Sequence, residues 1–220
     1  MARVDLHTHS IVSYDGGIAL HHYASLLFQR RAIDYVAVTD HNRIDAALEL
    51  RRELGDRIIV GEEIAAIEAD VIGLFLTNQI EPGMTLAETI KAIKAQGGLV
   101  YAPHPYERGR RSLGDRELES LHGEFDIIEI FNGRGWGRHK HQAAFQFAAK
   151  YRKARASSSD AHGKMGVGTA YVELAASPTR GNLVDLLERG TRVCRYAPAI
   201  SYFDPTINRI KKYFSIKHAS

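Results

Sequence analysis

Short apolar runs alternate with segments of helical periodicity along almost the whole chain. Runs rich in β-branched and aromatic residues predict strands, and apolar positions that recur every three or four residues predict helices. The expected strands cover residues 4–7, 35–39, 58–61, 69–76, 99–102, 126–131, 154–158, 171–174 and 191–195. The expected helices cover residues 18–31, 44–54, 86–96, 138–151 and 182–189. This alternation predicts an α/β fold with a largely parallel sheet, either open or closed into a barrel.

The segment 204–220 has a different pattern. Ile207, Ile210 and Phe214 recur at helical spacing, and three basic residues lie between them. A basic amphipathic helix of this kind binds a membrane or a partner in some proteins, but its apolar stripe more commonly packs on its own domain. We therefore expect one barrel over residues 1–203, with residues 204–220 packed against it.

Composition narrows the class of protein. The chain has 220 residues, 45% hydrophobic and 25% charged, with a formal net charge of +3. These values fit one globular domain and give no overall reason to expect nucleic-acid or membrane binding. Cys194 is the only cysteine, which excludes an internal disulfide and a thiolate metal site. No signal peptide or transmembrane stretch is evident, so a cytoplasmic protein is expected.

Candidate metal ligands fall at the carboxyl ends of the expected strands, where active sites of parallel α/β folds are built. Eleven histidines are present, and several of them stand at these ends. The strand-end side chains are His7, His9, Asp40, His41, Glu62, Glu63, His104, Asn132, Asp160 and His162. Residues two apart in extended backbone point the same way, so His7 and His9 can reach one cation. Nitrogen and carboxylate ligands without thiolates suit Zn²⁺, Mn²⁺ or Fe²⁺.

Seven motifs, together and in this order, give the chain a family resemblance. They are DLHTHS (5–10), SYDG (13–16), VAVTDHN (36–42), VGEEI (60–64), APHP (102–105), IEIFNGR (128–134) and SSDAH (158–162). With these motifs the chain resembles the PHP-domain (polymerase and histidinol phosphatase) proteins, and in particular the small stand-alone phosphoesterases among them. The resemblance implies a distorted seven-stranded (β/α)7 barrel, a relative of the eight-fold TIM barrel.

The resemblance also implies a ligand set for two or three divalent cations. His7, His9, Glu63 and Asp160 would hold the first cation, and Glu63 would bridge to a second cation that His104 also binds. A third cation would be held by Asp15, His41 and His162. Many family members have another histidine or cysteine near position 132, where this chain has Asn132. The amide carbonyl is a weaker ligand, so we expect the second site to be the labile one.

Other polar residues near these motifs have two possible roles each. Only one of Glu62 and Glu63 can point inward from a strand, and the resemblance selects Glu63. Asp40 is a candidate catalytic group, although orienting a ligand is the better interpretation. Arg134 is a candidate phosphate ligand, and the charge run with Arg108, Arg110 and Arg111 either contacts an anionic substrate or is solvated. Structural or solvent-facing roles are expected for His21, His22, His122, His139, His141 and His218.

The leading functional hypothesis is hydrolysis of a small phosphorylated metabolite or nucleotide. A hydroxide that bridges two cations would attack phosphorus, because bound metal lowers the pKa of water to about 7. Arg134 would neutralise the phosphoryl oxygens, while His41 or His162 would help the alcohol to leave. Alternatives are metal-dependent amide or ester hydrolysis and a non-catalytic metal-binding module. The loops at 83–86, 107–115 and 133–138 are expected to recognise the substrate.

Overall fold

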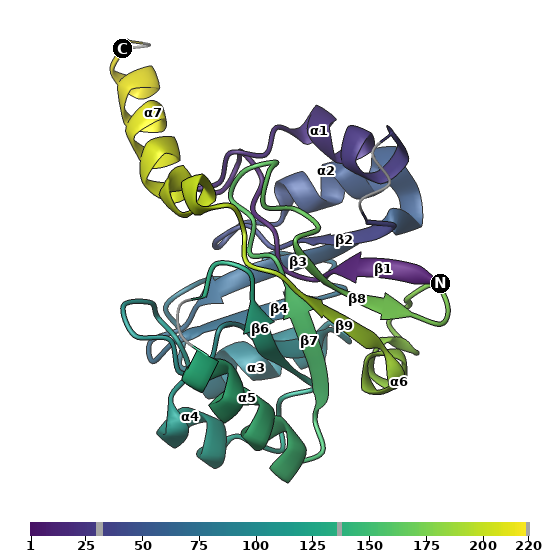
Figure 1. Ribbon diagram of the computed structural model, residues 1–220. Coiled ribbons are helices and arrows are strands. Elements are labelled where there is room, and N and C mark those ends of the chain that lie inside the picture. Colours follow the sequence, from purple (N-terminus) through teal and green to yellow (C-terminus); the bar gives the residue numbers. More distant parts are fainter. Residues whose placement is uncertain (30–32, 136–137, 219–220) are drawn as a thin grey trace.

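A strongly curved mixed sheet organises the computed structural model (Figure 1), which describes residues 1–29, 33–135 and 138–218. Within these ranges the sheet has nine strands in the order β7-β6-β5-β4-β3-β2-β1-β8-β9. The strands are β1 (Ala2–Asp5), β2 (Tyr35–Val38), β3 (Ile58–Ala65), β4 (Asp70–Leu74), β5 (Leu99–Ala102), β6 (Ile127–Asn132), β7 (Ala154–Ser158), β8 (Ala170–Leu174) and β9 (Thr191–Cys194). The hydroxyl of Ser157 on β7 donates to the carbonyl oxygen of Val193 on β9 at 2.8 Å, so the two edges nearly close a barrel.

The nine strands match the number of apolar runs in the sequence but differ from the seven that the family resemblance implied, and fewer of them are parallel than we expected. In the described chain, β1-β2, β2-β3, β5-β6 and β6-β7 pair in parallel, whereas β3-β4, β4-β5, β1-β8 and β8-β9 pair antiparallel. The connection from β3 to β4, residues 66–69, is too short for the crossover that parallel neighbours need. A hairpin therefore takes the place of one β/α unit.

Helices lie around this sheet, and most of them pack against its outer side. They are α1 (Leu20–Ala24), the π-helix Ser25–Gln29, α2 (Asp45–Leu54), α3 (Leu86–Ala95), α4 (Asp115–Ser120), α5 (Arg138–Lys150), α6 (Leu183–Arg189) and α7 (Asp204–His218), with 3₁₀ turns at Gly55–Arg57 and Ala199–Phe203. The capping box that the sequence predicts in front of α3 is present. The Thr85 hydroxyl accepts from the Glu88 amide, and the Glu88 carboxylate accepts from the Thr85 amide at 3.0 Å.

Alternate residues of each strand enter two different buried clusters. Val36 and Val38 pack with the helices in one cluster, whereas Ala37 between them belongs to the other. On the neighbouring strand, Ile59 belongs to the same cluster as Ala37. Ile58 and Val60, on either side of Ile59, belong to the cluster that packs with the helices. The pattern of apolar positions in the sequence thus decides which side chains point to each face, and the same alternation carries over to the polar residues at the strand ends.

Helix α7 does not pack in the way that its apolar stripe suggested. Ile207, Ile210 and Phe214 are 40%, 52% and 54% exposed, and the helix projects from the body of the protein (Figure 1). The face turned to the barrel carries Asn208 and Lys212, whose side chains donate to backbone carbonyl oxygens of the barrel loops. Hydrogen bonds from polar side chains, and not burial of the apolar stripe, therefore attach this helix to the barrel. The division at residue 203 stays a prediction.

Several sequence expectations fall partly on residues outside the described ranges. These are the end of the helix expected over 18–31, part of the loop 133–138, and the last two residues of the segment 204–220. The structure also does not describe the side chains of His139 and His218. Among the helices that are described, none is both long enough and apolar enough to cross a membrane.

Candidate metal centre

Two histidines that follow β1 lie at the bottom of the site. His7 and His9 are fully buried, and Thr8 between them forms a parallel bridge with Ala161. Because side chains alternate along extended backbone, Thr8 turns the other way and its hydroxyl donates to the carbonyl oxygen of Ala37 at 2.7 Å. The two imidazoles therefore point into the same space, with 3.1 Å between their Nε2 atoms.

Two carboxylates complete this group of donors. Oε2 of Glu63 lies 3.2 Å from Nε2 of both His7 and His9. Oδ1 of Asp160 lies 3.5 Å and 3.4 Å from the same two nitrogens. Four ligand atoms at about 2.1 Å from a tetrahedral cation are separated from one another by about 3.4 Å. The separations of these donors therefore fit one cation bound among the four side chains.

The second oxygen of Glu63 is directed at another histidine. Oε1 of Glu63 lies 3.0 Å from Nε2 of His104, and the hydroxyl of Ser112 lies 2.9 Å from Nδ1 of the same ring. A hydrogen bond to the second ring nitrogen is the usual way in which a protein orients a ligating imidazole. Glu63 thus reaches two donor groups at once, which is the geometry of a bridging carboxylate.

A third group of donors lies on the other side of His9. Oδ2 of Asp15 is 3.3 Å from Nε2 of His162 and 3.7 Å from Nε2 of His41. These three residues and His9 offer ligand atoms that all lie within 4.8 Å of one another. Nδ1 of His9 is buried and has no hydrogen-bond partner among the described residues. Because a buried nitrogen normally has a partner, the group fits a cation.

Protonation states in the centre suit metal binding. Burial opposes ionisation of Asp160 and Glu63, yet Arg110, His41 and His7 around them hold both carboxyl pKa values well below their usual range. Burial, with positive charge on His9 and Arg134, lowers the pKa of His162 to about 3. The carboxylates are therefore ionised and this imidazole is neutral, which are the forms that bind a cation.

The two deepest histidines carry positive charge in the metal-free protein. Burial alone would lower their pKa values, but Asp160 and Glu63 raise the pKa of His7 well above normal. The same two carboxylates raise the pKa of His9 to about 9. Protons thus balance the buried carboxylates, and bound cations would replace them.

Asn132 lies at the centre, and its hydrogen bonds define the orientation of its side-chain amide. Its Nδ2 donates to Oε2 of Glu129 at 2.9 Å and to Oδ2 of Asp160 at 3.2 Å. Its carbonyl oxygen accepts from the backbone amide of Arg134 at 2.9 Å. In this orientation Asn132 holds the ligand Asp160, and the amide oxygen does not face the donor groups.

Asp40 lies behind the centre. Its carboxylate accepts hydrogen bonds from the backbone amide and the hydroxyl of Ser10, at 2.6 Å and 2.5 Å, next to His9 in the chain. Asp40 is 1% exposed and is not among the described residues that line the cavity. The structure therefore supports an orienting position for Asp40 over contact with substrate.

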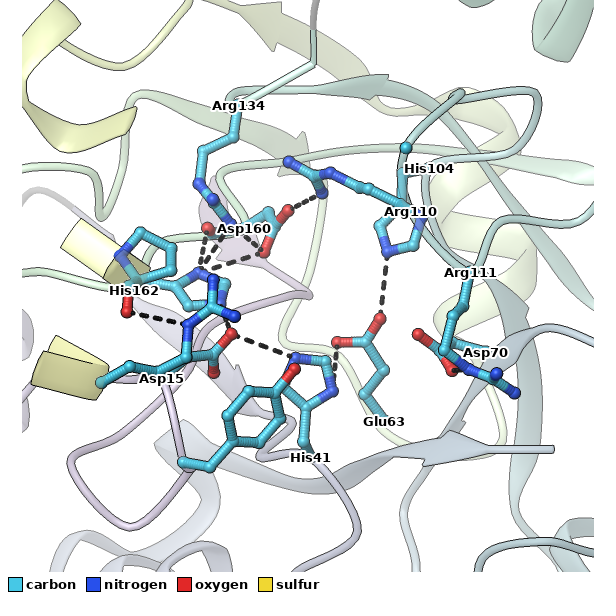
Figure 2. Close-up of a pocket in the computed structure, with 14 residues that line it drawn as sticks. Asp15, His41, Glu63, Asp70, His104, Arg110, Arg111, Arg134, Asp160 and His162 are labelled. Carbon is cyan, nitrogen blue, oxygen red and sulfur yellow. Dashed lines mark hydrogen bonds and ion pairs between the residues drawn. The ribbon is translucent and has the colours of Figure 1, made fainter. Parts of the chain in front are cut away.

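A cavity of about 580 Å³ opens above the three donor groups, and four arginines are among the residues that line it (Figure 2). Arg110 and Arg134 approach Asp160 from two directions, and Arg134 also lies 2.9 Å from Nδ1 of His162. Arg111 pairs with Asp70 at 2.9 Å on another wall. The loop that carries Arg110 and Arg111 thus faces the cavity in part, while Arg108 in the same loop is exposed. Metal donors at the floor and guanidinium groups at the walls together suit an anionic ligand.

Three residues of the centre escaped the sequence analysis. Glu129 accepts from the Tyr101 hydroxyl at 2.7 Å and the His104 amide at 2.5 Å, and lies 3.3 Å from Nδ1 of His7. In the sequence, Glu129 is recognisable only as an acidic residue among the apolar residues of the IEIFNGR motif, and the motif gave it no role. Asp70 and the C-terminal Arg209 also line the cavity, but they lie in segments without any motif.

The other histidines whose side chains the structure describes stand away from the donor groups. His21 and His122 are exposed, and His22 and His141 are partly buried on helices at other places in the fold. Their positions agree with the structural or solvent-facing roles that were expected.

Comparison with known proteins places the chain in a family. The family model for a PHP-associated region matches residues 138–191. Two uncharacterised proteins of Methanocaldococcus jannaschii are similar to the chain. One is 33% identical over 181 residues, which is 79% of this chain and 70% of the relative. The other is 42% identical over 107 residues, 47% of this chain, so the match spans only 61% of that relative's length.

The fold of the chain is similar to the folds of several solved structures. A two-domain protein of Bacteroides vulgatus containing a "predicted PHP-like metal-dependent phosphoesterase" aligns with a TM-score of 0.69 and 16% identity, over 94% of this chain and 69% of that one. The chain belongs to the PHP-domain family. An amidohydrolase of Chromobacterium violaceum with bound sulfate and no metal aligns with a TM-score of 0.63 and 16% identity, over 88% and 99% of the chains.

Two separate parts of the sequence support membership of the PHP-domain family. Six of the seven motifs precede residue 138, where the family-model match begins, and the seventh lies inside it. The resemblance drawn from the motifs is therefore confirmed by a region that contributed little to it. The PHP-domain assignment also accounts for a centre of histidine and carboxylate donors at the carboxyl ends of strands.

Proposed function

We propose that the chain is a metal-dependent phosphoesterase that hydrolyses a small phosphorylated metabolite or nucleotide. The observation that carries the proposal is the position of Arg110 and Arg134 directly above the donors of the metal centre. A cavity for a neutral amide or ester has no need of two guanidinium groups beside its cations, whereas a phosphoryl group has anionic oxygens for each of them.

The donor groups divide the work of holding two or three divalent cations. His7, His9, Glu63 and Asp160 would hold one cation, and Glu63 with His104 would take part in binding a second. Asp15, His41 and His162 would hold the third. Bound cations of this class activate water as a nucleophile and withdraw charge from phosphoryl oxygens. Zn²⁺, Mn²⁺ and Fe²⁺ all suit such donors.

Arg134 and Arg110 bind the phosphoryl group in this mechanism. Both guanidinium groups contact Asp160, and Nε of Arg134 is buried without a hydrogen-bond partner among the described residues. These guanidinium groups would turn from Asp160 to phosphoryl oxygens when that carboxylate holds a cation. Arg134 would bind the substrate, the role that we expect from the sequence, with Arg110 as a second ligand.

His41 and His162 assist the leaving alcohol. Both rings line the cavity beside Asp15, and burial lowers their pKa values, so that they are neutral near pH 7. Neutral imidazoles do not donate a proton efficiently as free acids. Together with Asp15 they would instead hold a cation at the side of the cavity where the oxygen departs, and its charge would stabilise the leaving group. Asn132 and Asp40 keep Asp160 and the His9 loop in position.

Amide or ester hydrolysis is the alternative reaction. One neighbour in fold is described as an amidohydrolase, and the same donors would serve attack on carbon. Measured side by side, p-nitrophenyl phosphate and p-nitrophenyl acetate separate the two reactions. We expect metal-dependent turnover of the phosphate and of members of a panel of phosphomonoesters and nucleotides. Faster turnover of the acetate would favour the alternative.

Adjacent glutamates provide a matched pair of variants. Glu63→Gln removes charge from two donor groups, so turnover should fall at least a hundredfold and bound metal should decrease. Glu62→Gln changes the neighbouring buried residue, whose carboxylate accepts from the Ile80 amide at 2.9 Å on the other face of β3. It should keep metal and turnover. Bound metal in the wild type without turnover of any phosphoester would support a non-catalytic module instead.

A further inference from the structure

One side chain of α7 joins the two loops that supply the third donor group. Nδ2 of Asn208 donates to the carbonyl oxygen of Asp15 and to that of His162, each at 2.9 Å. Asp15 and His162 are 147 residues apart in the sequence, yet the carboxylate of one lies 3.3 Å from the imidazole of the other. Asn208 therefore contacts the backbone of both residues where their side chains converge.

The chemistry of the contacts fixes the orientation of this amide. Both partners are carbonyl oxygens, which only accept hydrogen bonds, so the amino end of the carboxamide must face them. Both amide protons are then used, one for each loop. A hydroxyl or a carboxylate at position 208 cannot donate two hydrogen bonds in this way. The position thus requires a residue with two protons on one atom.

A second residue of the helix strengthens the same attachment. Nζ of Lys212 donates to the carbonyl oxygens of Ser13 and Gly16, the latter at 2.9 Å. The residues between them form the turn that presents Asp15, and the Ser13 hydroxyl donates to Oδ1 of Asp15 at 3.0 Å. Two residues four positions apart on one face of α7 therefore bring three donated hydrogen bonds to this turn and one to the loop of His162.

We propose that Asn208, supported by Lys212, is the positioning residue of the cation site formed by Asp15, His41 and His162. The proposal rests on the metal centre of the proposed function, but it does not depend on the reaction. In this arrangement α7 sets the separation of Asp15 and His162 and so the affinity of that site. The side-chain hydrogen bonds of Asn208 go to the loops of Asp15 and His162, and not to His7, His9, Glu63 or Asp160.

Manganese binding tests the proposal without reference to turnover. Full-length protein is stripped with chelator, dialysed against Mn²⁺ at graded concentrations, and analysed for bound ions. Asn208→Asp has nearly the same shape but cannot donate, and it places negative charge against two carbonyl oxygens. We expect the affinity of one ion to fall roughly 10- to 100-fold, as for loss of a residue that orients a ligand, with the other ions unchanged.

Two reference variants identify the affected site. Asp15→Asn removes charge from the proposed ligand itself and should weaken the same single ion. Ser215→Ala on the same helix removes a hydroxyl that contacts only the Lys211 carbonyl among the described residues, and it should bind Mn²⁺ as the wild type does. If Asn208 acted on overall stability alone, Asn208→Asp would lower the melting temperature without weakening one ion selectively.

A variant in the opposing loop reaches the same contact from the other side. A Cβ at Gly17 would lie 2.6 Å from the carboxamide of Asn208, so Gly17→Ala should displace Asn208 without changing any polar group. It should reproduce the loss of affinity at one ion. The proposal is wrong if Asn208→Asp and Gly17→Ala bind Mn²⁺ like the wild type, or if Asp15→Asn loses no ion. Absence of phosphoester turnover in the wild type would contradict only the proposed function.

Discussion

Glu63 offers one carboxylate oxygen to each of two donor groups. Oε2 lies among His7 and His9, and Oε1 faces His104, so the residue is common to both. Its neighbour Glu62 has the same side chain and the same burial but points to the other face of the strand. A difference of one position along β3 thus separates a metal donor from a residue that binds a backbone amide.

Protonated histidines lead to a prediction about metal binding. His7 and His9 carry protons at pH 7, because nearby carboxylates raise the pKa of His7 and bring that of His9 to about 9. Cation binding requires neutral imidazoles and should release about two protons near pH 7. Affinity should therefore rise as the pH increases towards 9. Calorimetric titration in two buffers of different ionisation enthalpy measures this release, and no buffer dependence would contradict it.

Glu129 leads to a second prediction for a single residue. It contacts the His104 amide, Asn132 and Nδ1 of His7, whereas Nε2 of His7 is the nitrogen that faces the other donors. Glu129→Gln should weaken metal binding roughly 10- to 100-fold, because it loosens several ligands without removing one. Metal titration measures the change. Glu173→Gln on β8, far along the sheet, serves as the control, and equal affinities of the two variants would show that Glu129 does not orient the ligands.

At the scale of elements, helix α3 depends on its capping box. Thr85→Ala removes the hydroxyl that accepts from the Glu88 amide. Loss of such a cap should destabilise the protein by about 1 kcal/mol, as measured by urea unfolding, with metal content unchanged. Thr206→Ala, an exposed position in the first turns of α7, is the comparison. An unchanged unfolding midpoint for Thr85→Ala would mean that solvent replaces the cap.

Elements were predictable where the apolar pattern is uninterrupted. Strands β5 and β7 begin and end where the sequence placed them, because each is buried and bounded by turn residues. The direction of β4 was not predictable, since an apolar run does not reveal its partner. In α7 the pattern was misleading because the polar side chains, and not the apolar stripe, contact the barrel. A prediction from apolar periodicity therefore fails where an element is attached by side chains that donate hydrogen bonds to backbone carbonyl oxygens.

The metal centre was predictable to the extent that motifs carry it. His7 and His9 are recognisable because a strand end and alternate spacing bring them to one place, whereas the choice of Glu63 over Glu62 rests on the family resemblance. Asp15 lies in a turn without periodicity, and only the family resemblance selects it. Asn208 has no motif at all, and its position depends on how α7 docks. Contacts between distant segments are set by tertiary packing, which local sequence does not report.

At the scale of the whole molecule, bound cations should contribute much of the stability. The centre concentrates buried carboxylates from several strands, whose repulsion cations relieve. A ligand present at 100 times its dissociation constant adds about 2.7 kcal/mol, and in a chain of this size that raises the melting temperature by roughly 5–10 °C. Thermal unfolding with Mn²⁺ and with chelator measures the difference. Glu63→Gln should lose most of it, and identical melting curves for the wild type would contradict the prediction.

The centre takes residues from nearly the full length of the chain, from His7 to Asn208. During synthesis the two histidines leave the ribosome well before the residues that enclose them. A nascent chain therefore carries the donors of β1 before the others have been made. Under the proposed role of α7, the third donor group is complete only after this helix has been translated, because α7 follows both of the loops that it holds together.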